Sequence, residues 1–235
     1  MILILASSVA IVIYQSFRRV IFTVSQVERY FNREKVFELP ARKHFNLTSL
    51  LMTKESNTST EIKKFANNIS NTKRICFIDI TQKNRFSKND LSDLAVLFFG
   101  AMVRKKNRKI LCSQMYRRNS SILRPFVGKG AIFEYSKSVP VEAIPDGKLC
   151  VLNRDDESRA KKTPPEISQE HQAFDQILYS SNTSDTSIPL LNLVEHCDHY
   201  VLLGKAGKVK MDELLRYASN YLFDQKKFLG FLLVK

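Results

Sequence analysis

Apolar and polar positions change their spacing near residue 73. From there, short apolar runs alternate with stretches whose apolar residues recur at helical spacing. The runs, which we expect to be strands, cover 75–80, 109–113, 148–152, 174–179, 199–204 and 228–234, and the helical stretches cover 88–103, 187–197 and 208–223. Continuous apolar strands separated by amphipathic helices are typical of a parallel sheet covered on both faces. The pattern predicts an α/β fold with a mostly parallel sheet, whose ligands bind at the carboxyl ends of the strands.

The first 17 residues carry no charge, and Arg18 and Arg19 follow them directly. About 17 residues is the lower limit for a helix that spans a bilayer, and a basic pair at its end favours a cytoplasmic position for that end. No basic residue precedes the run and no small-residue cleavage site follows it, so a secretory signal fits poorly. We therefore expect a transmembrane helix over 1–17 with the rest of the chain cytoplasmic. A buried N-terminal helix is the alternative.

The segment between this helix and residue 61 has a weaker pattern. Residues 24–34 have apolar positions at helical spacing, 35–40 form a strand-like run closed by Pro40, and 46–60 are polar with a Ser/Thr-rich end. We expect 18–60 to be a juxtamembrane connecting segment. The folded domain is then expected to cover 61–235, with its first helix over 61–69.

Positive charge is concentrated in one part of this basic chain, whose net charge is +14 over 235 residues. Residues 101–150 hold eleven Lys and Arg against three Asp and Glu, whereas 151–200 hold four against nine. The densest run contains Arg104, Lys105, Lys106 and Arg108 and follows a predicted helix. Such a run is typical of a solvated helix end, and it also suits contact with anionic lipid. No recognition helix, stacking motif or zinc motif accompanies it, which argues against nucleic acid.

The four cysteines lack any CxxC spacing, and three lie inside apolar runs. We expect reduced thiols in the core rather than disulfides or metal ligands.

The loop after strand 75–80 is the natural phosphate site of such a fold. A phosphate loop would follow the pattern GxxxxGK[ST], in which glycines let backbone N–H groups surround the phosphates. Here the chain continues ITQKNRFSKNDLSDLAVLFFG, and no glycine occurs between Lys73 and Gly100. Lys88 could replace the phosphate-binding lysine or could simply be a surface residue.

Segments along nearly the whole chain, in the same order, resemble a known family. They are VSQVERYFNREKVFELP, EIKKFANNI, RICFIDIT, LSDLAVLFF, KILCSQMYRRNSSIL, VGKGAIFEYSKSVPVEAI, KLCVLNRDDESRAKKTPPEI, FDQILYSSNT and EHCDHYVLLGKAGKVKMDELLRYASNYLFDQKKFLGFLLV. Together they are similar to the bacterial tyrosine kinases of exopolysaccharide and capsule assembly and their Wzz-like membrane partners. The resemblance implies a P-loop NTPase fold, a bacterial inner-membrane location and a cytoplasmic kinase-like domain. Arg117 and Arg118 match a pair of arginines in the family.

The departures from the family pattern fall on the chemistry. Ser113 and Met115 stand where the family has two metal-associated aspartates, and Ser180 stands where it has the aspartate of the Walker B-type motif. Because phosphoryl transfer depends on positioning Mg²⁺ and neutralising the phosphates, losing these groups with the glycines favours a pseudokinase without cofactor. Its expected role is that of a structural or regulatory partner in polysaccharide biosynthesis and export. Expected partners are polysaccharide assembly or export proteins, a Wzz-like co-polymerase, further copies of itself, and anionic lipid. The residues expected to contact a partner or lipid are Arg104, Lys105, Lys106, Arg108, Arg117 and Arg118.

Two other functions remain open. An active autokinase or ATPase would bind ATP and Mg²⁺ through an atypical loop, using Lys88, Ser87 and either Asp79 or Asp90. A positioning protein similar to ParA or MinD would use its basic face on DNA or membrane, but it too needs a phosphate loop.

The pair His196 and His199 has HxxH spacing. Because the strand-like run begins at His199, we expect a helix end there rather than a metal site. Asp198 matches an acidic residue common at this junction in the family, and we expect its role to be structural.

Overall fold

A parallel sheet forms the centre of the protein. The computed structural model describes residues 19–39, 60–81, 91–103, 108–114, 132–135, 149–152, 174–182, 187–218 and 224–235. Eight strands lie in the order β2-β10-β8-β3-β7-β4-β6-β5, and every neighbouring pair is parallel. In chain order they are β2 (Val36–Leu39), β3 (Arg74–Asp79), β4 (Ile110–Gln114), β5 (Ile132–Tyr135), β6 (Leu149–Leu152), β7 (Gln176–Asn182), β8 (His199–Lys205) and β10 (Phe228–Val234).

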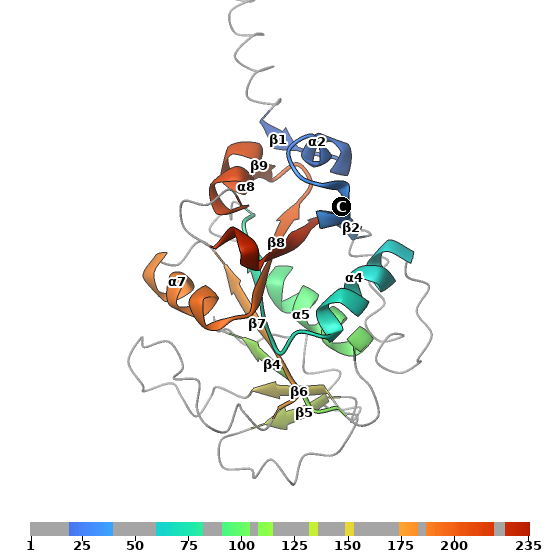
Figure 1. Cartoon of the computed structure of the whole chain (residues 1–235), viewed down its shortest axis with the longest axis vertical. Coiled ribbons are helices and arrows are strands. Elements are labelled where there is room, and N and C mark those ends of the chain that lie inside the picture. Colours follow the sequence, from blue (N-terminus) through green and yellow to red (C-terminus); the bar gives the residue numbers. More distant parts are fainter. Residues whose placement is uncertain are drawn as a thin grey trace, which may run out of the picture.

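Helices cover both faces of this sheet (Figure 1). Alternate residues of a strand point to opposite faces, so Ile75 and Phe77 of β3 pack with α4 (Thr60–Ser70) and α5 (Leu91–Val103). Cys76 and Ile78 belong instead to the cluster formed with α2, α7 and α8. Those helices cover Val24–Glu28, Ser187–His196 and Met211–Ala218. The result is a three-layer α/β/α fold.

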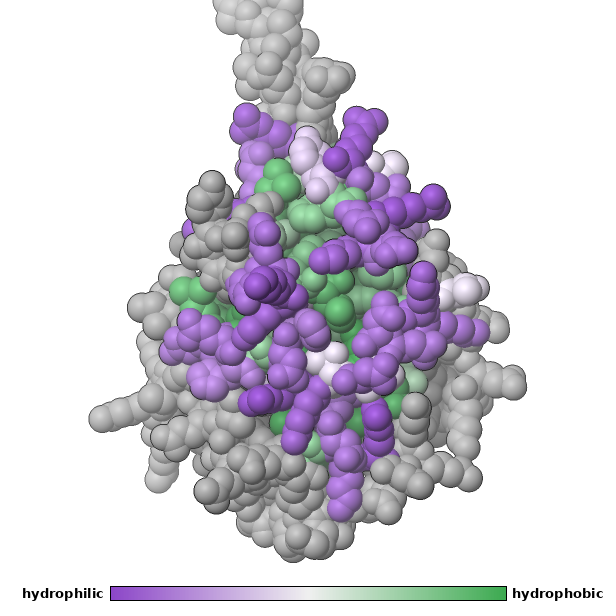
Figure 2. All heavy atoms as spheres, in the orientation of Figure 1, coloured by the Kyte–Doolittle hydropathy of each residue, from purple (hydrophilic) through white to green (hydrophobic). Residues whose placement is uncertain are grey.

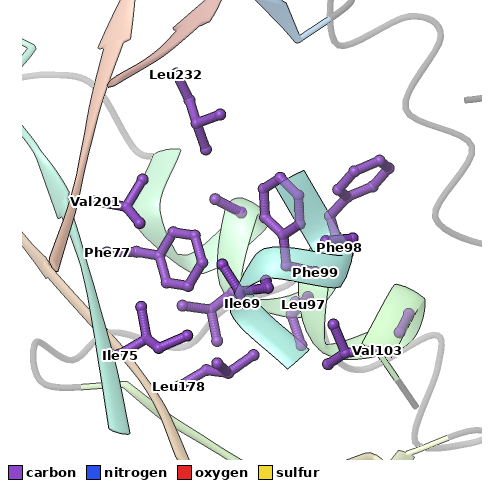
Figure 3. Packing of buried hydrophobic residues seen from close by; sticks show 14 of the residues in the cluster. Ile69, Ile75, Phe77, Leu97, Phe98, Phe99, Val103, Leu178, Val201 and Leu232 are labelled. Carbon is purple, nitrogen blue, oxygen red and sulfur yellow. The ribbon is translucent and has the colours of Figure 1, made fainter. Parts of the chain in front are cut away.

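Aromatic rings connect the sheet with α4 and α5, and Figure 3 shows two of them, Phe77 of β3 and Phe99 of α5. Phe99 stacks on Phe77 of β3 with a centroid distance of 5.6 Å, and it meets Phe65 of α4 edge-on at 5.1 Å. All three side chains are buried. Because aromatic contacts add to the burial of large apolar surfaces, this group fixes α5 beneath the central strands.

The sequence predicted most of this sheet. Each of the six predicted strands is present, with ends within three residues of the expected ones. The predicted helices over 61–69 and 187–197 are also present, and the described part of the one over 88–103 is α5. The α/β fold with a mostly parallel sheet is therefore confirmed. The predicted helix over 208–223 begins later than expected, because a two-residue strand, β9 (Val209–Lys210), occupies its start, and its described part is α8. Strand β5 was not predicted.

Residues 19–39 form part of the folded domain. β2 pairs with β10 at the edge of the main sheet, and β1 (Val20–Ile21) pairs antiparallel with β9. Only Val24–Glu28 of the expected helix over 24–34 is helical, because a turn and a short 3₁₀ helix, η1 (Arg33–Lys35), follow it. The described part of the expected connecting segment 18–60 thus contributes strands to both sheets.

None of the helices that the structure describes combines the length and the apolar character needed to cross a bilayer. The predicted transmembrane helix over 1–17 lies outside the described residues.

Candidate functional site

Buried polar side chains gather where β3, β4 and β7 end. The strand register places Phe77 beside Ser180, Asp79 beside Asn182 and Ser113 beside Tyr179. The buried polar and charged residues of the described part are Asp79, Ser92, Asp93, Ser113, Gln176, Ser180 and Ser181. All except Gln176 belong to the carboxyl ends of these strands or to the first turn of α5. This is the edge at which parallel α/β folds bind their ligands.

Ser180 and Asp93 are joined at this edge. The Ser180 hydroxyl donates a hydrogen bond to Asp93 Oδ1, and the two residues are only 2% and 9% exposed. Asp93 is the third residue of α5, where a carboxylate interacts favourably with the helix dipole. The aspartate in the first turn was visible in the sequence, but its partner on a strand 87 residues away was not.

Asp79 terminates β3 through a local turn. Its Oδ1 accepts a hydrogen bond of 2.8 Å from the Thr81 backbone N–H. Thr81 Oγ1 in turn accepts one of 3.1 Å from the Lys205 N–H, and the Ile80 N–H donates to the Leu203 carbonyl at 2.9 Å. These bonds connect the ends of β3 and β8, so Asp79 has a structural role that the sequence allowed for.

The remaining buried groups of the edge are hydroxyls. Ser113 on β4 is fully buried, and Ser181 is buried on β7 with no hydrogen-bond partner for its Oγ among the described residues. Ser113 and Ser180 are two of the predicted degenerate counterparts. Both lie at the carboxyl-end edge of the sheet, Ser113 on β4 and Ser180 on β7. Neutral hydroxyls are weaker ligands for Mg²⁺ than the carboxylates that usually hold it.

Several predicted residues lie outside the described part of the chain. They are Ser87, Lys88, Asp90, Arg104, Lys105, Lys106, Met115, Arg117 and Arg118. Arg108 is described and half-buried: its Nη1 donates a hydrogen bond of 2.6 Å to the carbonyl of Ser70, the last residue of α4. This cation therefore caps a helix within the domain.

Asp198 holds the junction between α7 and β8 against the start of β3. Its Oδ2 accepts a 2.8 Å hydrogen bond from the Arg74 N–H, and its own N–H donates to the Arg74 carbonyl at 2.9 Å. His196 ends α7 and His199 begins β8, as the sequence indicated. Within the described ranges, no three His, Cys, Asp or Glu side chains are grouped closely enough to hold a metal.

All four cysteines are buried and free. Burial raises the pKa of each of three thiols, to about 11 for Cys150 and well above the ordinary range for Cys76 and Cys112. Such thiols are poor nucleophiles, because the thiolate is the reactive form.

Two solved structures share this fold. The BceF tyrosine kinase domain superposes with a TM-score of 0.50 and 12% identity, covering 92% of this chain and 99% of that domain. The chimerical protein CapA2B2 superposes with a TM-score of 0.51 and 11% identity, covering 90% and 98%. No protein-family model and no curated protein matches the sequence. The chain therefore has the α/β fold of a tyrosine kinase domain, and identities this low establish the fold alone.

Proposed function

We propose that the chain is a catalytically inactive, kinase-like protein of the bacterial inner membrane. Its role is that of a structural or regulatory partner in exopolysaccharide or capsule biosynthesis and export. The fold shared with the BceF tyrosine kinase domain supports the kinase-like part of this proposal. The partner role and the location rest on the family resemblance and on the uncharged segment 1–17.

The bond between Ser180 and Asp93 is the observation that most favours inactivity. A nucleotide in this fold places its phosphates at the N-terminus of the helix that follows the central strand, which here is α5 after β3. The helix dipole and the backbone N–H groups at that end attract anions. In this chain a carboxylate already lies in the first turn of that helix. At about 5 Å and an effective dielectric constant of about 20, one carboxylate opposes each phosphate charge by roughly 3 kcal/mol.

The described residues of the edge fit a magnesium nucleotide poorly. Ser113 and Ser180 provide hydroxyls instead of carboxylates, and Ser180 is already bonded to Asp93. A reaction that uses ATP and Mg²⁺ is therefore not expected at this edge. The intact sheet and packed core leave a domain able to present surfaces to partners.

A genetic experiment tests the partner role. In the producing bacterium, deletion of the chain is expected to reduce polymer yield or length, and wild type and Lys88→Ala should restore it equally. Pull-down of the full chain should recover polysaccharide assembly or export proteins with both forms. Restoration by wild type but not by Lys88→Ala would instead indicate nucleotide chemistry.

An active autokinase or ATPase is the second candidate, favoured by Asp79. It is a buried carboxylate at the carboxyl end of β3, close to where a metal would bind in this fold. Radiolabelled phosphate from ATP appearing on tyrosines of the purified chain, and lost in Asp79→Asn, would establish this alternative.

A further inference from the structure

A basic and aromatic surface lies at the end of the molecule where β1 enters the fold. We call it the β1–β9 patch and define it by Phe22, Lys205, Lys208 and Lys210. Phe22 follows β1 directly, and the three exposed lysines lie at the end of β8, in the following turn and on β9. Figure 1 shows β1, α2, β9 and α8 together at this end, and in Figure 2 hydrophilic side chains gather around it.

The turn between β8 and β9 fixes the aromatic ring among the lysines. The Lys208 N–H donates to the Lys205 carbonyl at 3.0 Å, and Gly207 has the positive φ of 73° that the third position of a type II turn requires. The Gly207 N–H binds the Ile21 carbonyl at 2.8 Å. The Phe22 ring covers Gly207, yet 44% of Phe22 is exposed.

Phe22 and Tyr30 are the two large apolar side chains that the described part exposes. Tyr30, 59% exposed, follows α2, which contacts β1. Single exposed rings are common on protein surfaces. A ring fixed among lysines is better suited to a bilayer surface, because aromatic rings favour the headgroup region and lysines favour anionic lipid.

Asp212, Glu28 and Glu38 are each paired with a cation outside the patch. Arg19 binds Asp212 at 3.3 Å, Arg33 binds Glu28 at 3.5 Å and Lys235 binds Glu38 at 2.8 Å. No ion pair holds Lys205, Lys208 or Lys210 within the described part of the chain. The positive charge of the patch is therefore available to an anionic surface.

The position of the patch along the chain indicates which anionic surface it meets. Phe22 lies five residues after Phe17, the last residue of the uncharged segment. Five residues reach at most about 17 Å, so the patch lies within that distance of any bilayer that the segment enters. This step rests on the membrane attachment in the proposed function.

We propose that the β1–β9 patch docks on an anionic phospholipid bilayer and turns the carboxyl end of β8 toward the membrane. Phe22 enters the headgroup region, while the three lysines contact lipid phosphates. Arg108 is not part of this docking surface, because its guanidinium binds the carbonyl at the end of α4.

The absence of tryptophan from the chain allows a direct test. Phe22→Trp places one fluorophore in the patch. Asn71→Trp places one at an exposed position just before β3, at the amino ends of the strands, whereas the patch adjoins the carboxyl end of β8. The full-length variants are incorporated into vesicles of brominated phosphatidylcholine, with or without about a third phosphatidylglycerol. We expect blue-shifted, strongly quenched emission from the tryptophan at residue 22 in the anionic vesicles only, and molar salt should reverse both effects. The tryptophan at residue 71 should show unquenched emission in both kinds of vesicle.

Charge reversal provides the matched control. In Lys208→Glu/Lys210→Glu the ratio of docked to undocked protein should fall at least about 25-fold, because each lysine near an anionic surface contributes a factor of about five. Lys73→Glu/Lys226→Glu changes the net charge equally on exposed residues at the amino ends of β3 and β10, and it should dock as wild type does. Far-UV circular dichroism checks that each variant is folded.

Flotation on neutral vesicles tests the membrane attachment separately. If the chain floats but residue 22 is quenched no more than residue 71, or if both double variants behave alike, the docking proposal is overturned and the attachment stands. If the chain floats only on anionic vesicles and needs Lys208 and Lys210, the patch stands and the attachment through 1–17 falls. Retention of DNA that depends on these lysines, without lipid quenching, would overturn the proposal in favour of nucleic acid.

Discussion

Removing the Ser180 hydroxyl should destabilise the protein, whereas removing the neighbouring hydroxyl should not. Ser180→Ala leaves the buried carboxylate of Asp93 without one of its donors. Hydrogen bonds to charged groups contribute about 1.5–3 kcal/mol, so we expect a loss of roughly 2 kcal/mol in the free energy of unfolding. For a chain of this size the melting temperature should fall by roughly 4–8 °C.

Ser181→Ala is the matched control. Ser181 is equally buried on the same strand, but its Oγ has no partner among the described residues. A buried hydroxyl without a partner carries a desolvation cost, so its removal should be neutral or stabilising by up to about 1 kcal/mol.

Urea and thermal unfolding of the full chain in detergent micelles, followed by circular dichroism, measure both variants. A double-mutant cycle with Asp93→Ala isolates the bond between Ser180 and Asp93 from the other contacts of Asp93. A coupling energy near 2 kcal/mol is expected. A coupling energy near zero, or equal losses of stability from Ser180→Ala and Ser181→Ala, would refute a stabilising hydrogen bond between Ser180 and Asp93. The proposed inactivity would then lose its main support.

Three further predictions concern the framework around the site. Gly230→Ala should cost roughly 1–3 kcal/mol in urea unfolding, because its Cβ would lie 2.7 Å from the Lys35 carbonyl oxygen and force β2 from β10. Gly100→Ala should cost less, since the nearest neighbours of its added Cβ are movable side-chain atoms of Leu149 and Cys112. Equal losses from the two variants would contradict the close approach of the Lys35 backbone, just before β2, to Gly230. Arg108→Ala should lower stability by about 1 kcal/mol through loss of the bond to the Ser70 carbonyl, and unchanged stability would mean that this cation is free for other contacts. Burial raises the pKa of the Cys150 thiol to about 11, whereas an exposed cysteine ionises near 8.5. Folding therefore favours the protonated thiol, and its contribution to stability should be complete below about pH 8.5 and lost as the pH rises toward 11. Cys150→Ala should flatten that decline, and an unchanged pH profile would contradict the burial of this thiol.

The sheet could be predicted from the sequence because its central strands are apolar on both faces. Such runs as 75–80 and 199–204 have few alternatives to burial between two helical layers. The short strands were harder: β1 and β9 have two residues each, and β1 pairs with a segment almost 190 residues away. Local pattern carries little information about such long-range pairing.

The candidate site was predictable only in part. Ser113 and Ser180 were found because the family resemblance pointed to their positions, and their burial agrees with that placement. The role of Asp93 was missed, since its helical position alone does not show which strand residue it meets. Arg108 was grouped with its basic neighbours, because the sequence does not show that the end of α4 lies within reach of its guanidinium.

Binding of nucleotide is the central question, and calorimetry measures it directly. Mg-ATP and Mg-ADP are titrated into the purified full chain and into Lys88→Ala, with the chain's folding checked by circular dichroism. We predict no heat beyond dilution for either protein with either nucleotide. Micromolar binding by the wild-type chain that Lys88→Ala abolishes would contradict it.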